Sequence, residues 1–446
     1  MKKKCMRALL ALALLLCMLL ILPWLMPLGS FIPRLEQQAT ASLGVPVRAG
    51  SLRLSLLPTP HLTISRLVVG ADDALMAEQL AVLPSLLPLL SGRFMVARVM
   101  VEDVRLKPGA IEMLASTTSS TGTSSPAVQL GHLSLRRVKL DWPEMVLPTM
   151  DIDIALTALN TFRSAQLRSV DNKLQIDLEP DADGYAISAA AKDWVLPFGP
   201  PLLMDQLNMR LRLQGQALHI QSMRAAMYQG QLSAEGKLSW LGPWQLDGVF
   251  KLDKLALQQP VTLLSGKRRL SGHLFADGKL SARASEPGLL AQTLKAGVQF
   301  RVEDGVLYGL DLARAASLLL KQGAQGGETQ FDRLSGQLDA AGARYQFRQL
   351  KIASGLLTGE GKLTIMPDKT LDGVMQVALK HSVSLVAIPL QISGTLAQPT
   401  VFPTKAALAG AAAGTALMGP GVGTSLGVKA AGAVDNLKGL LGGSKD

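Results

Sequence analysis

Residues Gly230–Ser239 read GQLSAEGKLS, and this string occurs twice more with small changes. Residues 272–281 read GHLFADGKLS and residues 355–364 read GLLTGEGKLT, so the copies share G-x-L-x-[AG]-[DE]-G-K-L-[ST]. They start 42 and 83 residues apart, close to one and two periods of the same length. An acid–Gly pair followed by Lys–Leu is typical of a strand that bends at the glycine and continues. We therefore expect a repeating pair of strands, laid side by side along one axis.

Apolar and polar residues also alternate outside the repeats. On this pattern the apolar positions that we expect on one face are Leu133, Leu135, Leu174, Ile176, Leu178, Met209, Leu211, Leu213, Leu218 and Ile220. Each segment is short and is bounded by Gly, Pro, Asn or Asp. One apolar face and one polar face is typical of an antiparallel sheet with one side in water. The sequence therefore predicts a mainly β fold: a long, curled antiparallel sheet with an apolar groove.

Few helices are expected. Apolar residues spaced three and four apart predict one from Phe31 to Gly44 and a second over Leu310–Lys321. The apolar stretch Ala81–Leu90 contains two prolines, which favours a short helix or a loop packed on the sheet. Asp304-Gly305 is expected to form a tight turn between two strands.

Residues 8–28 carry no charge and follow four basic residues. A helix needs about 20 apolar residues to cross a bilayer. The positive flank places the N-terminus in the cytoplasm and sends the rest of the chain across the membrane. The run is longer than an ordinary signal core and lacks a good cleavage site, which favours a retained anchor; a cleaved signal peptide is the alternative.

Composition shifts divide the chain. The expected parts are 1–7 (cytoplasmic), 8–28 (anchor), 29–114 (N-terminal β module), 115–126 (Ser/Thr-rich linker), 127–296 (repetitive β groove), 297–403 (C-terminal β/α region) and 404–446 (Ala/Gly-rich tail). The tail is uncharged over 406–428, and Gly419-Pro420-Gly421 must break a helix. We expect a helical hairpin packed on the end of the sheet, with membrane insertion as the alternative.

The net charge of +11 is spread thinly, and aromatic residues make up 4% of the chain. There is thus little on which nucleic-acid bases could stack. The two cysteines, Cys5 and Cys17, both lie in or before the anchor, so the exported part has no disulfide.

No set of residues predicts catalysis. The five histidines are scattered singly, without metal-ligand spacing. Gly423–Gly427 matches the hydrolase elbow string, but no apolar strand precedes it. We expect no enzymatic activity, no metal and no cofactor.

Several motifs in order resemble AsmA-like proteins. At the start these are Leu43–Val47 (LGVPV) and L-x-L-x-L-x-P over 52–58. Towards the end they are Asp304-Gly305, Gly309–Leu312 (GLDL), Thr329-x-Phe331-x-x-Leu334, the repeat at 355–363, and Pro389–Leu396 (PLQISGTL) followed by Pro399 and the tail. The likeness is strong over about 297–430 and weaker over 127–290.

The resemblance implies a Gram-negative inner-membrane protein, anchored by residues 8–28, with its body in the periplasm. It further implies a β-groove similar to bridge-like lipid-transfer proteins, which would bind phospholipid acyl chains and support outer-membrane homeostasis. The tail is then a candidate contact with the outer membrane or with envelope proteins.

The residues alone lead to the same expectation, because a sheet with one apolar side must cover it, and few helices are available here. Such a sheet can curl on itself or shelter a ligand. The alternative function is an assembly scaffold that holds outer-membrane proteins at exposed strand edges.

Overall fold

The structure is a computed structural model with two compact units, Met1–Pro201 and Leu202–Asp446. It describes residues 28–55, 59–70, 73–85, 95–107, 109–110, 129–141, 146–157, 159–197, 201–317, 326–380, 387–418 and 424–430. The described residues confirm a mainly β protein with an open, curled sheet and a few short helices. The expected anchor lies outside the described residues except for Leu28, and within those residues no helix is long and apolar enough to span a bilayer.

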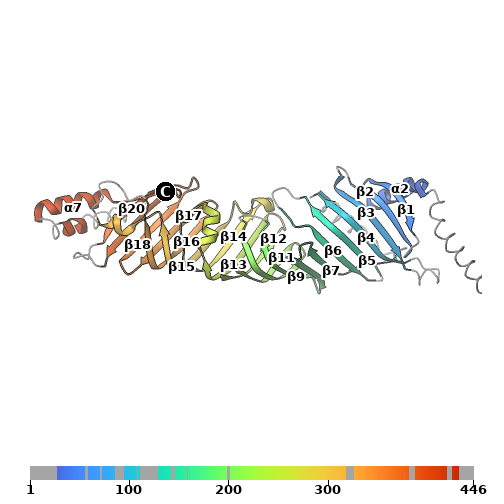
Figure 1. Ribbon diagram of the computed structural model, residues 1–446, viewed down its shortest axis with the longest axis horizontal. Helices are drawn as coiled ribbons and strands as arrows, with labels where there is room; N and C mark the ends of the chain where they lie inside the picture. The colour runs from blue at the N-terminus through green and yellow to red at the C-terminus, as the bar shows by residue number, and fades with distance from the viewer. Residues whose placement is uncertain are drawn as a thin grey trace, which may run out of the picture. The chain divides into compact units, whose positions relative to one another are not determined.

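The N-terminal unit is a row of strands in which each strand pairs with the next one in the chain (Figure 1). Its elements are η1 (Leu28–Phe31), α2 (Ile32–Leu43), β1 (Val47–Ser55), β2 (His61–Val69), β3 (Leu75–Pro84), β4 (Met95–Leu106), β5 (Gln129–Leu140), β6 (Met150–Leu156), β7 (Phe162–Ser169), β8 (Leu174–Asp181) and β9 (Gly184–Val195). All the described pairs in this unit are antiparallel except β4–β5, which is parallel.

The parallel pair accounts for the length of the segment that connects β4 and β5. Parallel neighbours need a crossover of a dozen or more residues, and 22 residues separate Leu106 from Gln129. The expected linker over 115–126 belongs to this crossover and lies outside the described residues. The strands before and after it are hydrogen-bonded to each other, so the segment connects two strands of one sheet.

Helix α2 covers the free edge of β1. The backbone N–H of Ala49 donates to Glu36 Oε1 at 2.7 Å, and that of Val47 donates to Thr40 Oγ1 at 3.1 Å. Unpaired N–H groups on an edge strand invite association with another chain. The helix expected over 31–44 is confirmed and has a protective role at the edge of the sheet.

The C-terminal unit is an antiparallel meander. Its elements are β10 (Leu203–Gln214), β11 (Ala217–Met227), β12 (Gly230–Ser239), β13 (Trp244–Ala256), α5 (Gln258–Ser265), β14 (His273–Ala284), η3 (Pro287–Leu289), β15 (Lys295–Tyr308), α6 (Leu312–Ala316), β16 (Glu328–Ala341), β17 (Arg344–Ala353), β18 (Leu357–Ile365), β19 (Leu371–Leu379), β20 (Ile388–Gly394), β21 (Pro399–Pro403) and α7 (Lys405–Met418). The three sequence repeats lie on β12, β14 and β18. One period of the repeat is therefore one strand pair, as expected.

The repeated glycine has a steric cause. A Cβ added at Gly236 would lie 2.6 Å from the backbone oxygen of Asp247, and one at Gly278 would lie 2.7 Å from that of Gly297. A Cβ added at Gly361 would collide with the backbone oxygen of Val374. Neighbouring backbone approaches this face too closely for any side chain, which is where glycine is needed in a bent strand.

A closed core forms where α6 packs against β16 and β19–β21. Leu312 and Ala315 of α6 are 1% and 0% exposed, and Leu390 and Val401 of the sheet are both 0% exposed. Val261 of α5 packs against the same core. The short helices of this unit therefore seal one part of the apolar face.

Three local expectations need correction. Residues 81–84 are not a helix or a loop but continue β3. The strand tolerates Pro84 because this residue is its last one, where the missing N–H costs little. Residues 86–90 lie outside the described residues. Asp304-Gly305 is not a turn, because β15 runs through it with Asp304 at φ 50°. The helix expected over 310–321 begins two residues later, at Leu312 after the N-cap Asp311, and is described as far as Ala316; residues 318–321 lie outside the described residues.

The tail is helical where it is described, in α7 and over 424–430. Residues 419–423, where the sequence predicts the break of a hairpin, lie outside the described residues.

Candidate functional site

The strand register lines up apolar residues across the whole N-terminal unit. Residues paired between neighbouring strands point to the same face of a sheet. The first line, called the Leu135 row, is Leu52, Ile64, Leu80, Val101, Leu135, Ile152, Leu167, Ile176 and Ala189. The second, called the Leu133 row, is Leu54, Leu62, Val82, Val99, Leu133, Ile154, Ala165, Leu178 and Ile187. Each row crosses β1 to β9 without one polar residue.

The C-terminal unit has the same arrangement. The Met209 row is Met209, Met223, Ala234, Phe250, Gly278, Val298, Leu338, Phe347, Leu363, Gly373, Ile392 and Val401. The Leu211 row is Leu211, Ile220, Gly236, Gly248, Leu280, Ala296, Ala340, Tyr345, Ile365 and Leu371. A shorter Leu213 row is Leu213, Leu218, Leu238, Leu246 and Ala282. We call the faces that carry these rows the apolar faces.

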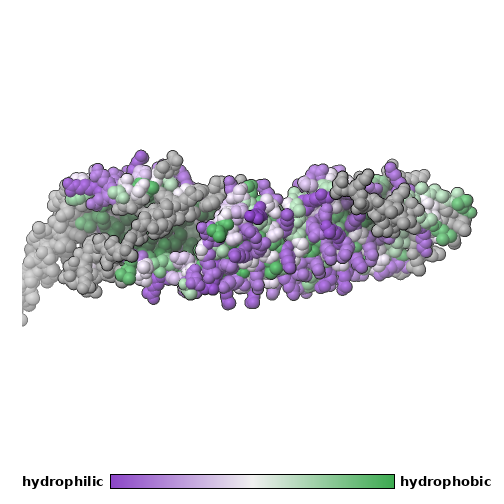
Figure 2. Space-filling view, turned by 180° about the vertical axis from the view of Figure 1, so that it is seen from behind, coloured by the Kyte–Doolittle hydropathy of each residue, from purple (hydrophilic) through white to green (hydrophobic). Residues whose placement is uncertain are grey.

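Most side chains of the apolar faces are half-buried. On β13, for example, Leu246, Phe250 and Leu252 are all half-buried, while the alternate residues Asp247, Val249 and Lys251 are exposed. Such side chains pack against their neighbours on the sheet and, within the described ranges, keep part of their surface accessible. Figure 2 shows hydrophobic side chains gathered in a hollow of the N-terminal unit, between edges rich in hydrophilic ones. An apolar face of this kind can accept an apolar ligand.

Nine of the ten residues singled out from the sequence lie on these rows. The tenth, Leu174, is 9% exposed and pairs with Ala191 of β9. Their contact with a ligand stays a prediction. Sequence reasoning missed the continuation of the apolar face over β12–β18, although the leucines of the repeats, Leu238, Leu280 and Leu363, mark it.

Two aromatic residues of the C-terminal apolar face form a close pair. The rings of Phe300 and Phe347 pack edge to face, with centroids 5.9 Å apart. Both are half-buried. Gly336 lies opposite Phe300 and has no side chain to fill the space, so the surface of the face is uneven in depth.

The apolar face is open at one end of the C-terminal unit and sealed at the other. The Met209 row is half-buried from β10 to β18. In β19–β21 it is buried, and Ile392 and Val401 are 4% and 0% exposed. The sealed end is the part against which α6 packs. A ligand could therefore lie on the open floor, whereas the sealed end behaves as an ordinary protein core.

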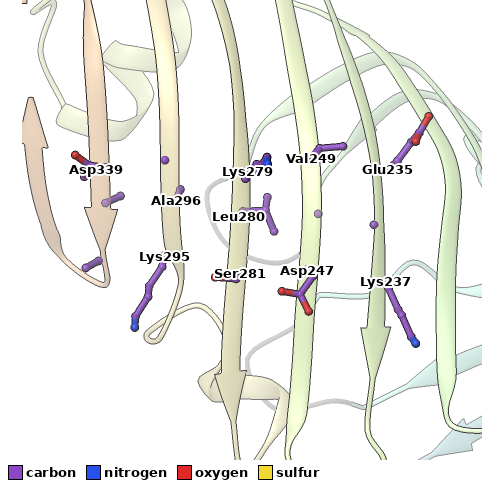
Figure 3. A pocket seen from close by; sticks show the side chains of 15 residues that line it. Glu235, Lys237, Asp247, Val249, Lys279, Leu280, Ser281, Lys295, Ala296 and Asp339 are labelled. Carbon is purple, nitrogen blue, oxygen red and sulfur yellow. The ribbon is translucent and has the colours of Figure 1, made fainter. Parts of the chain in front are cut away.

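The opposite face is polar. A shallow hollow of about 780 Å³ runs over β12–β16, between two lines of side chains that alternate with the Leu211 row. Figure 3 shows Lys237, Asp247, Ser281 and Lys295 at one level of neighbouring strands. Opposite charges such as Lys237 and Asp247, paired across β12 and β13, stabilise a sheet modestly. The hollow is a solvated surface and contains no charge cluster of a single sign.

Charged residues cluster where β4 runs parallel to β5. Arg137 Nε donates to Asp103 Oδ1 at 2.7 Å, and Arg137 Nη2 donates to Glu102 Oε2 at 3.0 Å. The hydrogen bond from Arg137 is the main reason why the pKa of Asp103 lies below its ordinary value. These exposed groups connect the two parallel strands on the polar side, which indicates a structural role.

A second carboxylate of this cluster accepts hydrogen bonds from a hydroxyl and from a guanidinium. Burial alone would raise the pKa of Asp153, but hydrogen bonds from Ser134 and Arg136 outweigh it and lower that pKa. Ser134 Oγ donates to Asp153 Oδ1 at 2.7 Å, and Arg136 Nη2 lies 2.9 Å from the same oxygen. Asp153 therefore remains a charged, fully engaged partner of its neighbours.

Across the described ranges, no group of three or more His, Cys, Asp or Glu side chains could hold a metal ion. Ser425, from the hydrolase-like string, lies in the helical segment 424–430. The chain matches no protein-family model, and neither the curated proteins nor the solved structures contain a match to it.

Proposed function

We propose that this chain binds phospholipid acyl chains on the apolar faces of its sheet and conducts phospholipids along them between two membranes. The observation that carries the proposal is the continuity of the apolar rows together with their partial exposure. The Leu135 and Leu133 rows cross nine strands, and the Met209 row crosses twelve. Half-buried Leu, Ile, Val and Met side chains bind by area and not by shape, so they suit a ligand that slides.

The energetics favour this use of an open apolar face. Exposing an acyl chain to water costs about 0.8 kcal/mol per methylene, so a two-chain lipid faces a barrier on the order of 20 kcal/mol. A continuous apolar floor removes most of that barrier, and the headgroup stays in water beside the polar edge. No covalent step is required, so the mechanism needs no catalytic group.

The proposal includes the location expected from the sequence. Residues 8–28 would anchor the chain in the inner membrane, with the body in the periplasm, as the resemblance to AsmA-like proteins implies. The transferred lipid would then supply the outer membrane.

A photo-crosslinking scan along β8 tests the proposal. A benzophenone amino acid is placed in turn at Gln175, Ile176, Asp177 and Leu178 of the full chain in cells, and phospholipid adducts are measured by mass spectrometry. We expect adducts at Ile176 and Leu178 and few at Gln175 and Asp177, because side chains alternate between faces. The sealed residue Val377, which is 0% exposed, provides a negative control.

Adducts without this alternation, or none at Ile176 and Leu178, would overturn the proposal. Adducts to outer-membrane proteins in place of lipid would instead support the scaffold function expected as the alternative.

A further inference from the structure

The last turn of helix α5 contains two leucines that the described part of the chain leaves exposed. Its first half packs inwards, since Pro260 is buried and Val261 packs against the hydrophobic core of the unit. Leu263 and Leu264 are 48% and 63% exposed. Two adjacent exposed leucines at the end of a short helix are an apolar point of contact for something outside this chain.

The segment that contains α5 is entirely free of acidic residues. Between Asp253 and Asp277 the sequence contains Lys254, Lys267, Arg268 and Arg269 and no Asp or Glu. The first three of these basic residues are exposed. The exposed leucines therefore lie immediately before a basic run in the chain.

Two contacts hold the basic run against the folded unit. Arg269 Nη2 donates to the carbonyl oxygen of Ala397 at 2.6 Å, across 128 residues of sequence. The guanidinium carbon of Arg268 lies 5.4 Å from the centroid of the Tyr308 ring. The run is thus ordered, and its remaining donors point to solvent because Arg268 and Lys267 are exposed.

Two acidic residues lie near the start of α5. A hollow of about 530 Å³ is lined by Asp205 and Asp304 together with Gln258 and Gln259, the first two residues of the helix. The leucines and the basic run belong to the last turn of α5 and the residues after it. One end of this element is therefore apolar and basic without a neighbouring carboxylate in the sequence.

We propose that the end of α5 and the basic run Lys267–Arg269 dock on the surface of a bilayer that contains anionic lipids. Exposed leucines flanked by basic residues bind such surfaces, because apolar insertion and attraction to anionic headgroups act together. This inference rests on the proposed function: α5 follows β13 and packs on the core through Val261, so docking there would bring a bilayer to the unit whose sheet carries the open apolar rows. Charge complementarity selects a bilayer over an apolar protein partner.

The test uses the full chain held in a nanodisc of zwitterionic phosphatidylcholine. Cys5→Ser and Cys17→Ser remove the two cysteines of the chain, and Leu264→Cys then carries a polarity-sensitive fluorophore. Leu159→Cys is the matched control, because Leu159 is 69% exposed and lies in the other unit. Vesicles of phosphatidylcholine, with or without phosphatidylglycerol at about one third of the lipid, are then added.

We expect the fluorescence at position 264 to rise about twofold or more with anionic vesicles, with little change at position 159. Lys267→Gln with Arg268→Gln should weaken the vesicle response about thirtyfold while leaving the circular dichroism spectrum unchanged. Equal responses at positions 264 and 159 would overturn the inference, as would a response to neutral vesicles as large as that to anionic ones.

The phospholipid that co-purifies with each sample separates this inference from the proposed function. If lipid is bound but position 264 stays silent, docking at α5 is wrong and the lipid-binding face stands. If position 264 responds but the chain holds no lipid, docking stands and the conduit fails.

Discussion

A single carboxylate on the apolar face should block lipid binding without unfolding the protein. Leu178 is half-buried on β8, between Ala165 of β7 and Ile187 of β9. Full burial of a leucine is worth about 1.5–3 kcal/mol, so Leu178→Asp should lower the free energy of unfolding by about 1 kcal/mol. The N-terminal unit should remain folded.

The effect on lipid should be much larger. An extended acyl chain lays about four methylenes across one strand spacing of about 4.8 Å. A charged carboxylate keeps that part of the row wet, which costs about 3 kcal/mol at 0.8 kcal/mol per methylene. Lipid affinity should therefore fall about a hundredfold, since each 1.4 kcal/mol is tenfold.

Displacement of a fluorescent phospholipid from the purified full chain measures this affinity. The matched control is Ala190→Asp, which adds the same charge at an exposed position of β9 opposite Gln175. Ala190→Asp should bind lipid as the parent does. If Leu178→Asp is folded by circular dichroism and binds lipid as tightly as Ala190→Asp, the assignment of the apolar face is refuted.

Three further predictions concern the sheet itself. Gly236→Ala should lower the free energy of unfolding, measured by urea denaturation, by about 1–3 kcal/mol, because the added Cβ would lie 2.6 Å from a backbone oxygen. The control is Gly288→Ala, whose Cβ would have no atom within 4 Å, and it should change the free energy of unfolding by less than about 0.5 kcal/mol. Glu36→Ala removes a 2.7 Å hydrogen bond to the edge strand β1 and should cost about 1 kcal/mol, with more self-association in ultracentrifugation; an unchanged monomer would count against the edge role of α2. Arg137→Ala should raise the pKa of Asp103 towards its ordinary value in an NMR titration. A depressed carboxyl pKa stabilises the fold above the unfolded pKa and loses that effect as the pH falls through the folded one, so the parent should lose stability in acid more steeply than this variant.

The two-sided character of the sheet could be predicted because a period of two survives any change in strand pairing. Ile176 and Leu178 must share a face whichever strand lies beside them. Register is different, since it depends on turns and bulges. Asp304 has φ 50° inside β15, whereas the dipeptide Asp304-Gly305 is typical of a turn in the sequence. Arg66 and Lys254 also have positive φ values, and because Arg and Lys rarely adopt them, the residue types do not predict a bulge at these positions.

The sequence could not predict where the apolar face is open and where it is covered, for another reason. The helical pattern near Leu312 was visible, but the surface that it covers is decided by tertiary packing against β19–β21. The parallel pairing of β4 with β5 was equally hidden, because an alternating strand has the same pattern in either direction.

Native mass spectrometry of the full chain, released gently from its own membranes, tests the central claim most directly. The account predicts that the protein carries one or more phospholipid masses, and that Leu178→Asp shifts the population towards the lipid-free mass while Ala190→Asp does not. A lipid-free protein that stays so after incubation with phospholipid vesicles would contradict the account.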